Sequence, residues 1–257
     1  MEDLEIKISL AADKIMNSKH LVAFTGAGIS VESGIPSFRG EDGLWSKYDP
    51  QVLELSHFHQ YPLESWTVIK EIFYDFFGEA RPNPAHVVLA NLEKSGLLKC
   101  VITQNIDNLH QTAGNTVVHE FHGNSHNLVC TKCKRHFGLA EVNLDVLPPK
   151  CGLCQGLLKP DFIFFGEGIP TQAYQASHIA AEKADVFVII GSTGEVSPAN
   201  QIPVHAKNTG ATIIEVNPEK SRYTDYITDI HLKGKAGEIM TKLMEQISIK
   251  LKSKETK

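Results

Sequence analysis

Apolar side chains near the start of the chain recur at steps of three and four residues, which is the spacing of an amphipathic helix. These positions are Leu4, Ile8, Ala11, Ala12, Ile15 and Met16. The fully apolar run of residues 21–24 follows at once and ends just before two glycines, Gly26 and Gly28. Such a run is typical of a buried parallel strand that leads into a loop. We therefore predict a helix followed directly by a strand.

Further short apolar runs occur along the chain, and several are separated by segments of helix length with Ala, Leu and Ile at helical spacing. These runs are residues 100–103, 162–165, 186–190 and 212–216. The alternation predicts an α/β fold with a doubly wound parallel sheet. Ligands of such sheets bind at the C-terminal ends of the strands, and here polar and glycine-rich segments follow the strands directly.

Two regions interrupt this alternation. Residues 40–80 are rich in aromatic side chains and lack a clear strand, so we expect a loop with one or two helices. Residues 123–160 contain four paired cysteines and indicate a small inserted zinc module. We therefore divide the chain into a helical insert at 40–80, a zinc-binding small domain at 123–160, and a main α/β domain made of residues 1–39, 81–122 and 161–257.

The 257-residue chain carries 25 Lys and Arg against 30 Asp and Glu, a formal net charge of −5, which argues against direct binding of nucleic acid. Its 42% of hydrophobic residues are spread evenly, so the whole length can bury a core. The longest apolar run, 186–190, is far shorter than the roughly 20 residues that span a bilayer. The start is acidic and unlike a signal peptide, so we expect a cytoplasmic protein that does not insert into membranes.

Five cysteines occur in the chain, and in a reducing cytoplasm we do not expect them to form structural disulfides. Four form two Cys-x-x-Cys pairs, Cys130 with Cys133 and Cys151 with Cys154. This spacing matches an all-cysteine zinc ribbon, in which four thiolates fill the tetrahedral shell of the metal. We therefore predict one structural Zn²⁺ with no open position for catalysis. The fifth, Cys100, is expected to be a small buried hydrophobe.

The loop after the first predicted strand contains Gly26, Ala27 and Gly28, followed by Ser30. Without a Cβ, glycine lets backbone N–H groups approach a phosphate closely. The dinucleotide fingerprint of dehydrogenases would require a further glycine at position 31, where this chain has Val31. The loop therefore indicates phosphate binding outside the ordinary dehydrogenase pattern; a tight turn that only reverses the chain is the alternative.

Polar side chains also follow the strand at residues 100–103. Gln104 and Asn105 can each hold a ribose hydroxyl or a carboxamide, and Asp107 can accept a hydrogen bond from an amide NH2. Capping of a helix by Asn105 or Asp107 is the alternative.

His122 lies at the tip of another predicted strand, beside Gly123, which would let a ligand come near. An imidazole at such a place is a candidate general base. A solvated or capping histidine is the alternative interpretation.

In combination, these motifs resemble the sirtuins, the family of NAD-dependent protein deacylases. The resemblance extends over about residues 21–238, and the short segments outside it are typical of a compact, prokaryotic type. Its motifs occur in the family order, at residues 26–30, 33–40, 104–107, 122–123, 130–133, 151–154, 159–167, 191–192 and 215–217.

The resemblance implies a Rossmann-like NAD-binding domain plus the small zinc domain, with NAD and an acyl-lysine peptide meeting between them. It implies a reaction in which the acyl oxygen attacks C1′ of the nicotinamide ribose, nicotinamide leaves and an alkylamidate forms. His122 would then act as general base on a ribose hydroxyl. The products would be free lysine, nicotinamide and O-acyl-ADP-ribose.

The resemblance also implies roles for individual residues, with His122 and Asn105 catalytic. Phe38 would shield the ribose and Arg39 would lie toward the phosphates. The residues expected to bind NAD are Gly26, Ala27, Gly28, Ser30, Phe38, Arg39, Gln104, Asn105, Ile106, Asp107, Gly191, Ser192, Asn217 and Ala236. Those expected to contact the acyl-lysine substrate are Ile163, Phe165, Gly166, Glu167, Gly194, Glu195 and Val196.

Two places depart from the family pattern. Ser37 stands where many members carry Asp, and it can hydrogen-bond without bringing a charge. Gly194 and Glu195 stand in a segment that normally pairs with the substrate backbone. We expect Gly194 to loosen this segment and Glu195 to add a negative charge, which leaves the peptide preference open.

Two other kinds of function use the same motifs. An NAD hydrolase or a mono-ADP-ribosyltransferase would pass ADP-ribose to water or to a protein side chain. A non-catalytic NAD-sensing module would bind NAD only, and His122 disfavours it because a sensor needs no base.

The acyl preference follows from a missing motif. Family members that remove succinyl or malonyl groups hold the acyl carboxylate with a Tyr-x-x-Arg pair, and this chain contains none. Residues 66–77 instead resemble an apolar helix, which either forms ordinary core or lines an acyl tunnel. We therefore expect a deacetylase, acting as a monomer on acyl-lysine proteins or peptides, that also accepts longer uncharged acyl groups.

Overall fold

The computed structural model describes residues 2–37 and 43–255, and its main sheet consists of six parallel strands in the order β3-β2-β1-β7-β8-β9. Parallel pairing holds along the whole sheet. The predicted runs at 21–24, 100–103, 186–190 and 212–216 are confirmed as strands of this sheet. The strands are β1 (Leu21–Thr25), β2 (Leu98–Thr103), β3 (Val118–Glu120), β7 (Val186–Ile190), β8 (Thr212–Asn217) and β9 (Ile230–Lys233).

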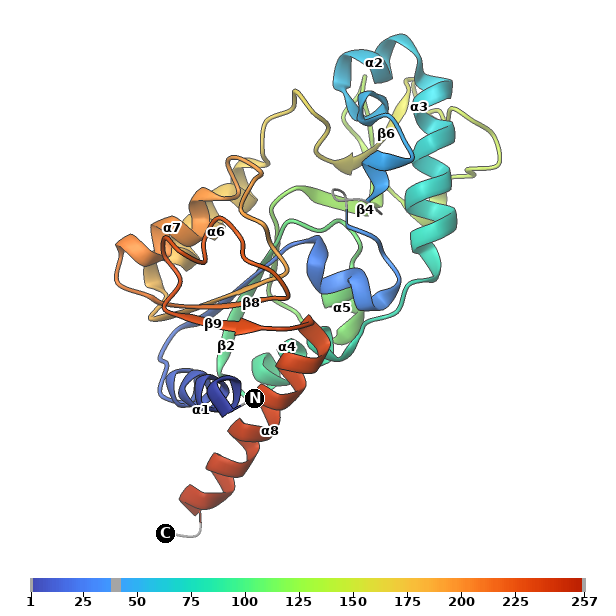
Figure 1. Ribbon diagram of the computed structural model, residues 1–257. Helices are drawn as coiled ribbons and strands as arrows, with labels where there is room; N and C mark the ends of the chain where they lie inside the picture. Colours follow the sequence, from blue (N-terminus) through green and yellow to red (C-terminus); the bar gives the residue numbers. More distant parts are fainter. Residues whose placement is uncertain (1, 38–42, 256–257) are drawn as a thin grey trace.

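Helices cover both faces of the main sheet (Figure 1). Val188 of β7 packs toward one layer of helices and its neighbour Ile189 toward the other, because successive side chains of a strand point to opposite faces. No helix in the described part of the chain is both long and apolar enough to cross a bilayer. One layer contains α1 (Glu2–Met16), α4 (Pro84–Lys94) and α8 (Ala236–Glu255); the other contains α6 (Thr171–Lys183) and α7 (Gln201–Asn208).

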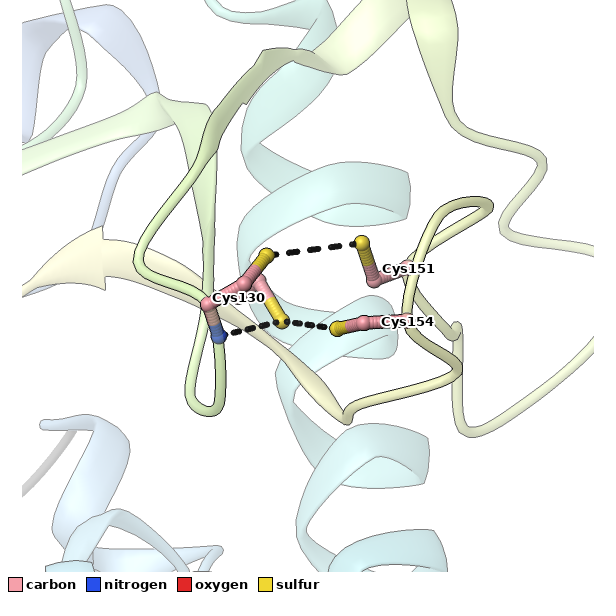
Figure 2. Close-up of side chains that lie close together, drawn as sticks. Cys130, Cys151 and Cys154 are labelled. Atoms are coloured by element: carbon pink, nitrogen blue, oxygen red, sulfur yellow. Dashed lines mark hydrogen bonds between the residues drawn. The ribbon is translucent and has the colours of Figure 1, made fainter.

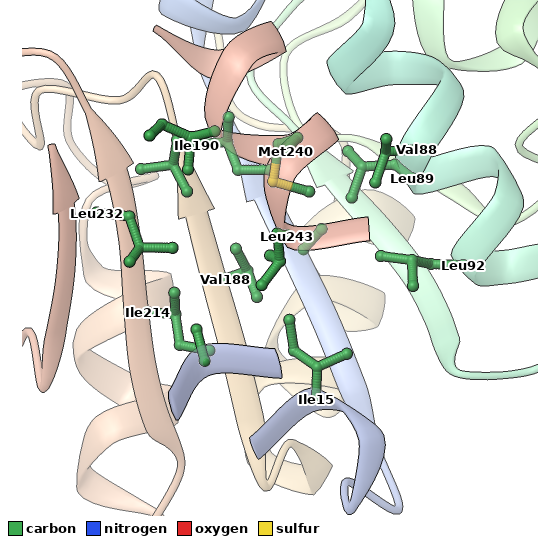
Figure 3. Close-up of a cluster of buried hydrophobic side chains, with 14 of the residues drawn as sticks. Ile15, Val88, Leu89, Leu92, Val188, Ile190, Ile214, Leu232, Met240 and Leu243 are labelled. Atoms are coloured by element: carbon green, nitrogen blue, oxygen red, sulfur yellow. The ribbon is translucent and has the colours of Figure 1, made fainter. Parts of the chain in front are cut away.

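The layer of α1, α4 and α8 contains the apolar cluster shown in Figure 3. Ile15 of α1 and Leu243 of α8 are fully buried there and lie in one cluster with Ile214 of β8. The helical spacing predicted for the start of the chain is thus confirmed. Each large side chain buried in this way contributes roughly 1.5–3 kcal/mol to folding.

A second, antiparallel sheet consists of β4 (Gly123–Cys130), β5 (His136–Gly138) and β6 (Leu158–Phe162). It corrects one prediction, because the apolar run at 162–165 contributes no strand to the parallel sheet. Only Phe162 of that run lies in a strand, where it pairs with Gly123 of β4. Phe162 and Phe164 are buried in the core of this smaller lobe. Their apolar character therefore reflects a different core from that of the parallel strands.

The helical region before β2 packs onto the antiparallel sheet and shares its core. Trp66 is fully buried and donates from Nε1 to the carbonyl of Leu158 at 2.8 Å. The predicted division into an insert at 40–80 and a zinc domain at 123–160 stays a prediction, while the two segments pack as one hydrophobic cluster. The region contains α2 (Leu55–Gln60), α3 (Pro62–Ile69), a π-helical continuation (Lys70–Phe76), and the 3-10 turns Leu44–Ser46, Pro50–Leu53 and Phe77–Glu79.

The four paired cysteines meet at one end of the antiparallel sheet (Figure 2). Their sulfur atoms all lie within 4.8 Å of one another, with Cys130 to Cys154 at 3.5 Å and Cys133 to Cys151 at 3.8 Å. A tetrahedral Zn²⁺ with bonds of about 2.3 Å requires sulfur atoms about 3.8 Å apart. The thiols therefore fit the predicted structural zinc, with all four positions supplied by protein.

We predict about one zinc ion per chain and loss of both metal and activity in Cys151→Ser, because zinc binding at such sites contributes folding free energy on a scale of ~10 kcal/mol. Metal analysis by mass spectrometry after dialysis measures the zinc. Cys100→Ala, which removes a buried thiol of β2 remote in sequence from both pairs, is the control and should keep its zinc. An active wild-type protein without zinc would contradict the prediction.

Candidate active site

The strand order determines where a ligand can bind. The chain proceeds outward from β1 to β2 and β3, and it later places β7, β8 and β9 on the other side of β1. The connections after β1 and β7 therefore leave the sheet in opposite directions. Such a switch point opens a crevice at the carboxyl ends of the strands.

A cavity of about 620 Å³ lies at this switch point, a volume within the range of small-molecule sites. His122 and Val196, both predicted to be functional, line it. The predicted NAD-binding residues that line it are Gly26, Ala27, Gly28, Gln104, Asn105, Gly191, Ser192, Asn217 and Ala236.

Other predicted residues lie elsewhere. Ser30, Ile106 and Asp107 are not in the wall of the cavity, and Phe38 and Arg39 lie outside the described residues. Part of the wall was not predicted from the sequence, although the position of residues 218–221, directly after the apolar run at 212–216, could have indicated them. The missed residues are Val31, Glu32, Thr193, Val216, Pro218, Glu219, Lys220, Ser221 and Lys235.

Two loop backbones touch at this edge of the sheet. The N–H of Gly28 donates to the carbonyl of Gly191 at 2.9 Å. A Cβ on Gly28 would lie 2.6 Å from Cα of Gly191, and a Cβ on Gly191 would lie 2.3 Å from the nitrogen of Ile29. Gly191 also has φ of +64°, which side chains disfavour. Only glycine therefore lets the two loops pack this closely, and we call this contact the glycine cradle; both residues line the cavity, as expected for a loop pair that holds a dinucleotide such as NAD.

Side-chain amides connect the loops around the cavity. Gln104 donates from Nε2 to the hydroxyl of Ser192 at 2.9 Å, and Asn217 donates from Nδ2 to the carbonyl of Ser192 at 3.1 Å. Asn217 also donates to the fully buried carboxylate of Glu215 at 2.8 Å. Three hydroxyl groups donate to the same carboxylate and thereby hold the chain after β8; they belong to Ser221, Thr224 and Thr228.

Asn105 lines the cavity, and Ser30 and Asp107 form a hydrogen-bond network with it behind the wall. Ser30 donates from Oγ to Oδ2 of Asp107 at 2.6 Å, and Asn105 donates from Nδ2 to Oγ of Ser30 at 3.1 Å. The second oxygen of Asp107 accepts from the N–H of Leu109 at 3.0 Å, at the start of the short helix α5 (Leu109–Ala113). Asp107 therefore holds the first N–H of α5 from outside the helix, whose N-cap residue is Asn108, and it also fixes the Asn105 amide.

His122 lies between the end of β3 and the start of β4. Its Nδ1 is 3.0 Å from the carbonyl oxygen of Gln104. A carbonyl only accepts, so Nδ1 carries the proton and Nε2 is left as the acceptor. Burial lowers the pKa of His122, although the bond to Gln104 opposes this shift. At neutral pH the ring is therefore neutral and able to take a proton at Nε2.

A pair of histidines that was not predicted from the sequence lies deeper in the protein. His86 and His110 are buried, with ring centroids 4.9 Å apart. Burial lowers the pKa of both, for His86 to about 4. Nε2 of His110 is 2.9 Å from the hydroxyl of Thr25, which donates to the hydroxyl of Thr103. The Thr103 hydroxyl also accepts from the backbone N–H of Asn105. Neutral imidazoles thus support the loop that carries Asn105.

Residues 162–167, which include four of the predicted substrate residues, connect the two lobes. The N–H of Ile163 donates to the carbonyl of His122 at 2.8 Å. The N–H of Phe165 donates to the carbonyl of Leu53 at 2.8 Å, and the N–H of Leu55 donates back to Phe165 at 3.0 Å. The segment does not line the cavity, but it adjoins His122 through this backbone bond.

The expectation that Gly194 loosens its segment is wrong. Gly194 has φ of +74°, and a Cβ there would lie 2.9 Å from the ring of Tyr223. Asn200 donates from Nδ2 to its carbonyl at 3.2 Å. Glycine is therefore the residue that lets this turn pack tightly against Tyr223, while Glu195 is exposed beside it.

Comparisons with known proteins agree with this architecture. The Sir2 family model matches residues 26–198. NAD-dependent protein deacylase 2 of Pyrobaculum aerophilum is 41% identical over 248 residues, which cover 95% of this chain and 97% of that protein.

Solved structures are similar over both lobes. A complex of a Sir2 homologue variant with ADP-ribose has a TM-score of 0.90 at 40% identity and covers 95% of this chain and 97% of its own. A complex of Sir2 with a p53 peptide and NAD⁺ has a TM-score of 0.85 at 34% identity and covers 92% and 97%. The resemblance noted in the motifs is thus confirmed, and the chain belongs to the Sir2 family, the sirtuins.

Proposed function

We propose that this chain is an NAD-dependent protein-lysine deacylase that releases nicotinamide and O-acyl-ADP-ribose. The observation that carries the proposal is that His122, with Nε2 left to accept a proton, lines the same cavity as the glycine cradle. An NAD sensor would need the cradle but no base. The relative named as an NAD-dependent deacylase, and the related complex with NAD⁺ and a p53 peptide, support the same function.

In this proposal the cradle of Gly28 and Gly191 faces the phosphates of NAD, and Asn217 and Ala236 lie toward its adenosine. When bound, NAD supplies an activated ribose carbon with nicotinamide as its leaving group. The protein's contribution is to hold that carbon against the acyl oxygen of the lysine and to keep water away.

His122 would accept a proton from a ribose hydroxyl at Nε2. The carbonyl of Gln104 fixes the tautomer and the direction of the ring. Asn105 donates from Nδ2 to Ser30, so its carbonyl oxygen is the atom directed to accept from a ribose hydroxyl or from water.

For the substrate we propose contacts with Val196, which lines the cavity, and with Ile163, which is bonded to the backbone of His122. Phe165, whose side chain is exposed, and Gly166 follow in the same segment and would face the peptide. Glu195 is exposed on the turn after β7 and would add its negative charge near the peptide. A monomeric state, a cytoplasmic location and the absence of nucleic-acid partners stay predictions from the sequence.

Release of nicotinamide tests the function directly. Wild-type protein is incubated with NAD, with and without an acetyl-lysine peptide, and nicotinamide and deacetylated peptide are measured by chromatography and mass spectrometry. We expect nicotinamide release to depend on the peptide and to equal the amount of lysine freed. Release that is independent of peptide would instead indicate an NAD hydrolase, and binding without release would indicate a sensor.

His122→Ala should reduce kcat/KM by at least the ~10²-fold that is typical of a general base, while ADP-ribose binding is kept. The matched control is His126→Ala, because His126 is an exposed histidine of the adjoining strand β4. Since His122 acts as the neutral form and burial lowers its pKa, wild-type kcat/KM should fall only as the pH drops below the usual value of about 6.5. Near-normal turnover by folded His122→Ala would refute the assignment.

Succinyl-lysine should be a poorer substrate than acetyl-lysine in the same peptide, by roughly tenfold or more. The helical stretch at 66–77, which comprises the end of α3, the π-helical continuation and the start of a 3-10 turn, contributes Ile69, Phe73 and Phe77 to a buried apolar cluster. A carboxylate buried without a cationic partner costs several kcal/mol. Comparison of kcat/KM for acetyl, octanoyl and succinyl peptides measures the preference, and succinyl-lysine as the best substrate would contradict it.

A further inference from the structure

Lys159 of β6 is 5% exposed, which is unusual for a lysine. Its ammonium group has three N–H donors, and three acceptors surround it. Nζ lies 2.8 Å from the carbonyl oxygen of Pro160, 2.7 Å from that of Phe162 and 2.9 Å from Oε2 of Glu167. The charge is therefore fully satisfied inside the protein.

Glu167 is bound within its own segment. Its Oε2 also accepts from the N–H of Phe164 at 2.8 Å, and its side chain is 22% exposed. The ammonium of Lys159 lies 4.2 Å from the centroid of the buried Phe164 ring, which adds a cation–π contact. The carboxylate expected from the motif to contact substrate is thus already occupied by a lysine and a backbone amide.

The ion pair closes residues 159–167 into a loop. Two positions of this loop reach other parts of the molecule: Ile163 donates to the carbonyl of His122, and Phe165 pairs with the backbone at Leu53 and Leu55. A change in the loop would therefore alter the position of Ile163 relative to His122. None of residues 159–167 lines the switch-point cavity.

We propose that Lys159 and Glu167 are positioning residues for the acyl-lysine peptide. They act through the segment 162–167, which they hold so that Ile163 lies beside His122, and they do not contact the peptide themselves. This inference rests on the proposed deacylase function for its kinetic readout. It assigns Glu167 a different role from the direct substrate contact that the motif implies.

Breaking a buried ion pair by removing one partner is costly because the other charge is left uncompensated. Glu167→Gln is the sharpest change, since the amide oxygen still accepts from Phe164 while the negative charge is lost. We expect the KM for an acetyl-lysine peptide to rise at least about tenfold, with the Kd for ADP-ribose within about twofold of wild type. Steady-state kinetics and titration calorimetry measure the two quantities.

Lys159→Met and the double variant Lys159→Met/Glu167→Gln complete a double-mutant cycle, which measures the coupling between the two residues. Methionine is unbranched and nearly as long as lysine, but it removes the buried cation and its contact with the Phe164 ring. If the two charges act as a pair, the double variant should lose less kcat/KM than the product of the two single losses, by about tenfold. These variants also keep the proposal testable if Glu167→Gln does not fold.

The matched control is Asp161→Asn, which removes a carboxylate that is hydrogen-bonded to a histidine in the same stretch of chain. Oδ2 of Asp161 lies 3.1 Å from Nδ1 of His136, and the two side chains are 35% and 61% exposed, more than those of Lys159 and Glu167, at 6% and 22%. Exposed pairs contribute little, so kinetics should stay within about twofold of wild type. The proposal would be overturned if the peptide KM of Glu167→Gln were as close to the wild-type value as that of this control. It would also be overturned if Glu167→Gln weakened ADP-ribose binding by the same factor as it raised the peptide KM.

Hydrogen exchange separates this proposal from the deacylase function. The amides of Ile163 and Phe165 are bonded in the wild type, and they should exchange at least about tenfold faster in Glu167→Gln while amides of β1 and β7 are unchanged. If wild-type protein shows no deacylation, the proposed function fails but this measurement still tests the ion pair. Unchanged exchange at both amides would refute it.

Discussion

Two loop backbones approach so closely at Gly28 and Gly191 that neither residue has room for a Cβ. This contact occurs because β1 and β7 are neighbours in the sheet although much of the chain lies between them in the sequence. Once these strands pair, the loops after them form a cradle of backbone atoms. The amides of Gln104 and Asn217 then connect to the same loop at Ser192. The geometry of the cavity is thus a consequence of strand order.

The smaller lobe joins the main sheet next to His122, the proposed general base. β3 ends at Glu120 and β4 begins at Gly123, so only Phe121 and His122 lie between the two sheets. Phe121 is fully buried in the core beside the main sheet, and the carbonyl of His122 accepts from Ile163 on the other side. His122 is therefore positioned from both lobes. A site at such a junction can bring together a dinucleotide held by one lobe and a polymer held by the other.

Much of this arrangement was predictable because local patterns determine it. Fully apolar runs followed by glycine or amides identified β1, β2, β7 and β8, and the paired cysteines identified the four-thiol cluster. The run at 162–165 was misplaced because an apolar stretch does not reveal which core buries it. The tight turn at Gly194 was missed because the ring it packs against, Tyr223, comes from another loop. The pairing of Lys159 with Glu167 likewise depends on a turn whose path the sequence pattern does not specify.

The shared core of the smaller lobe has a consequence for its modularity. Trp66 and Phe73, from before β2, and Leu158 and Phe164, from after the cysteine pairs, belong to one hydrophobic cluster. The segment around the cysteine pairs therefore does not form an independent module, because its removal would leave Trp66 and Phe73 without the side chains they pack against. A functional chimaera would need to take both stretches from the same parent. We therefore expect recombination within the family to keep the two stretches together, although they are separate in the gene.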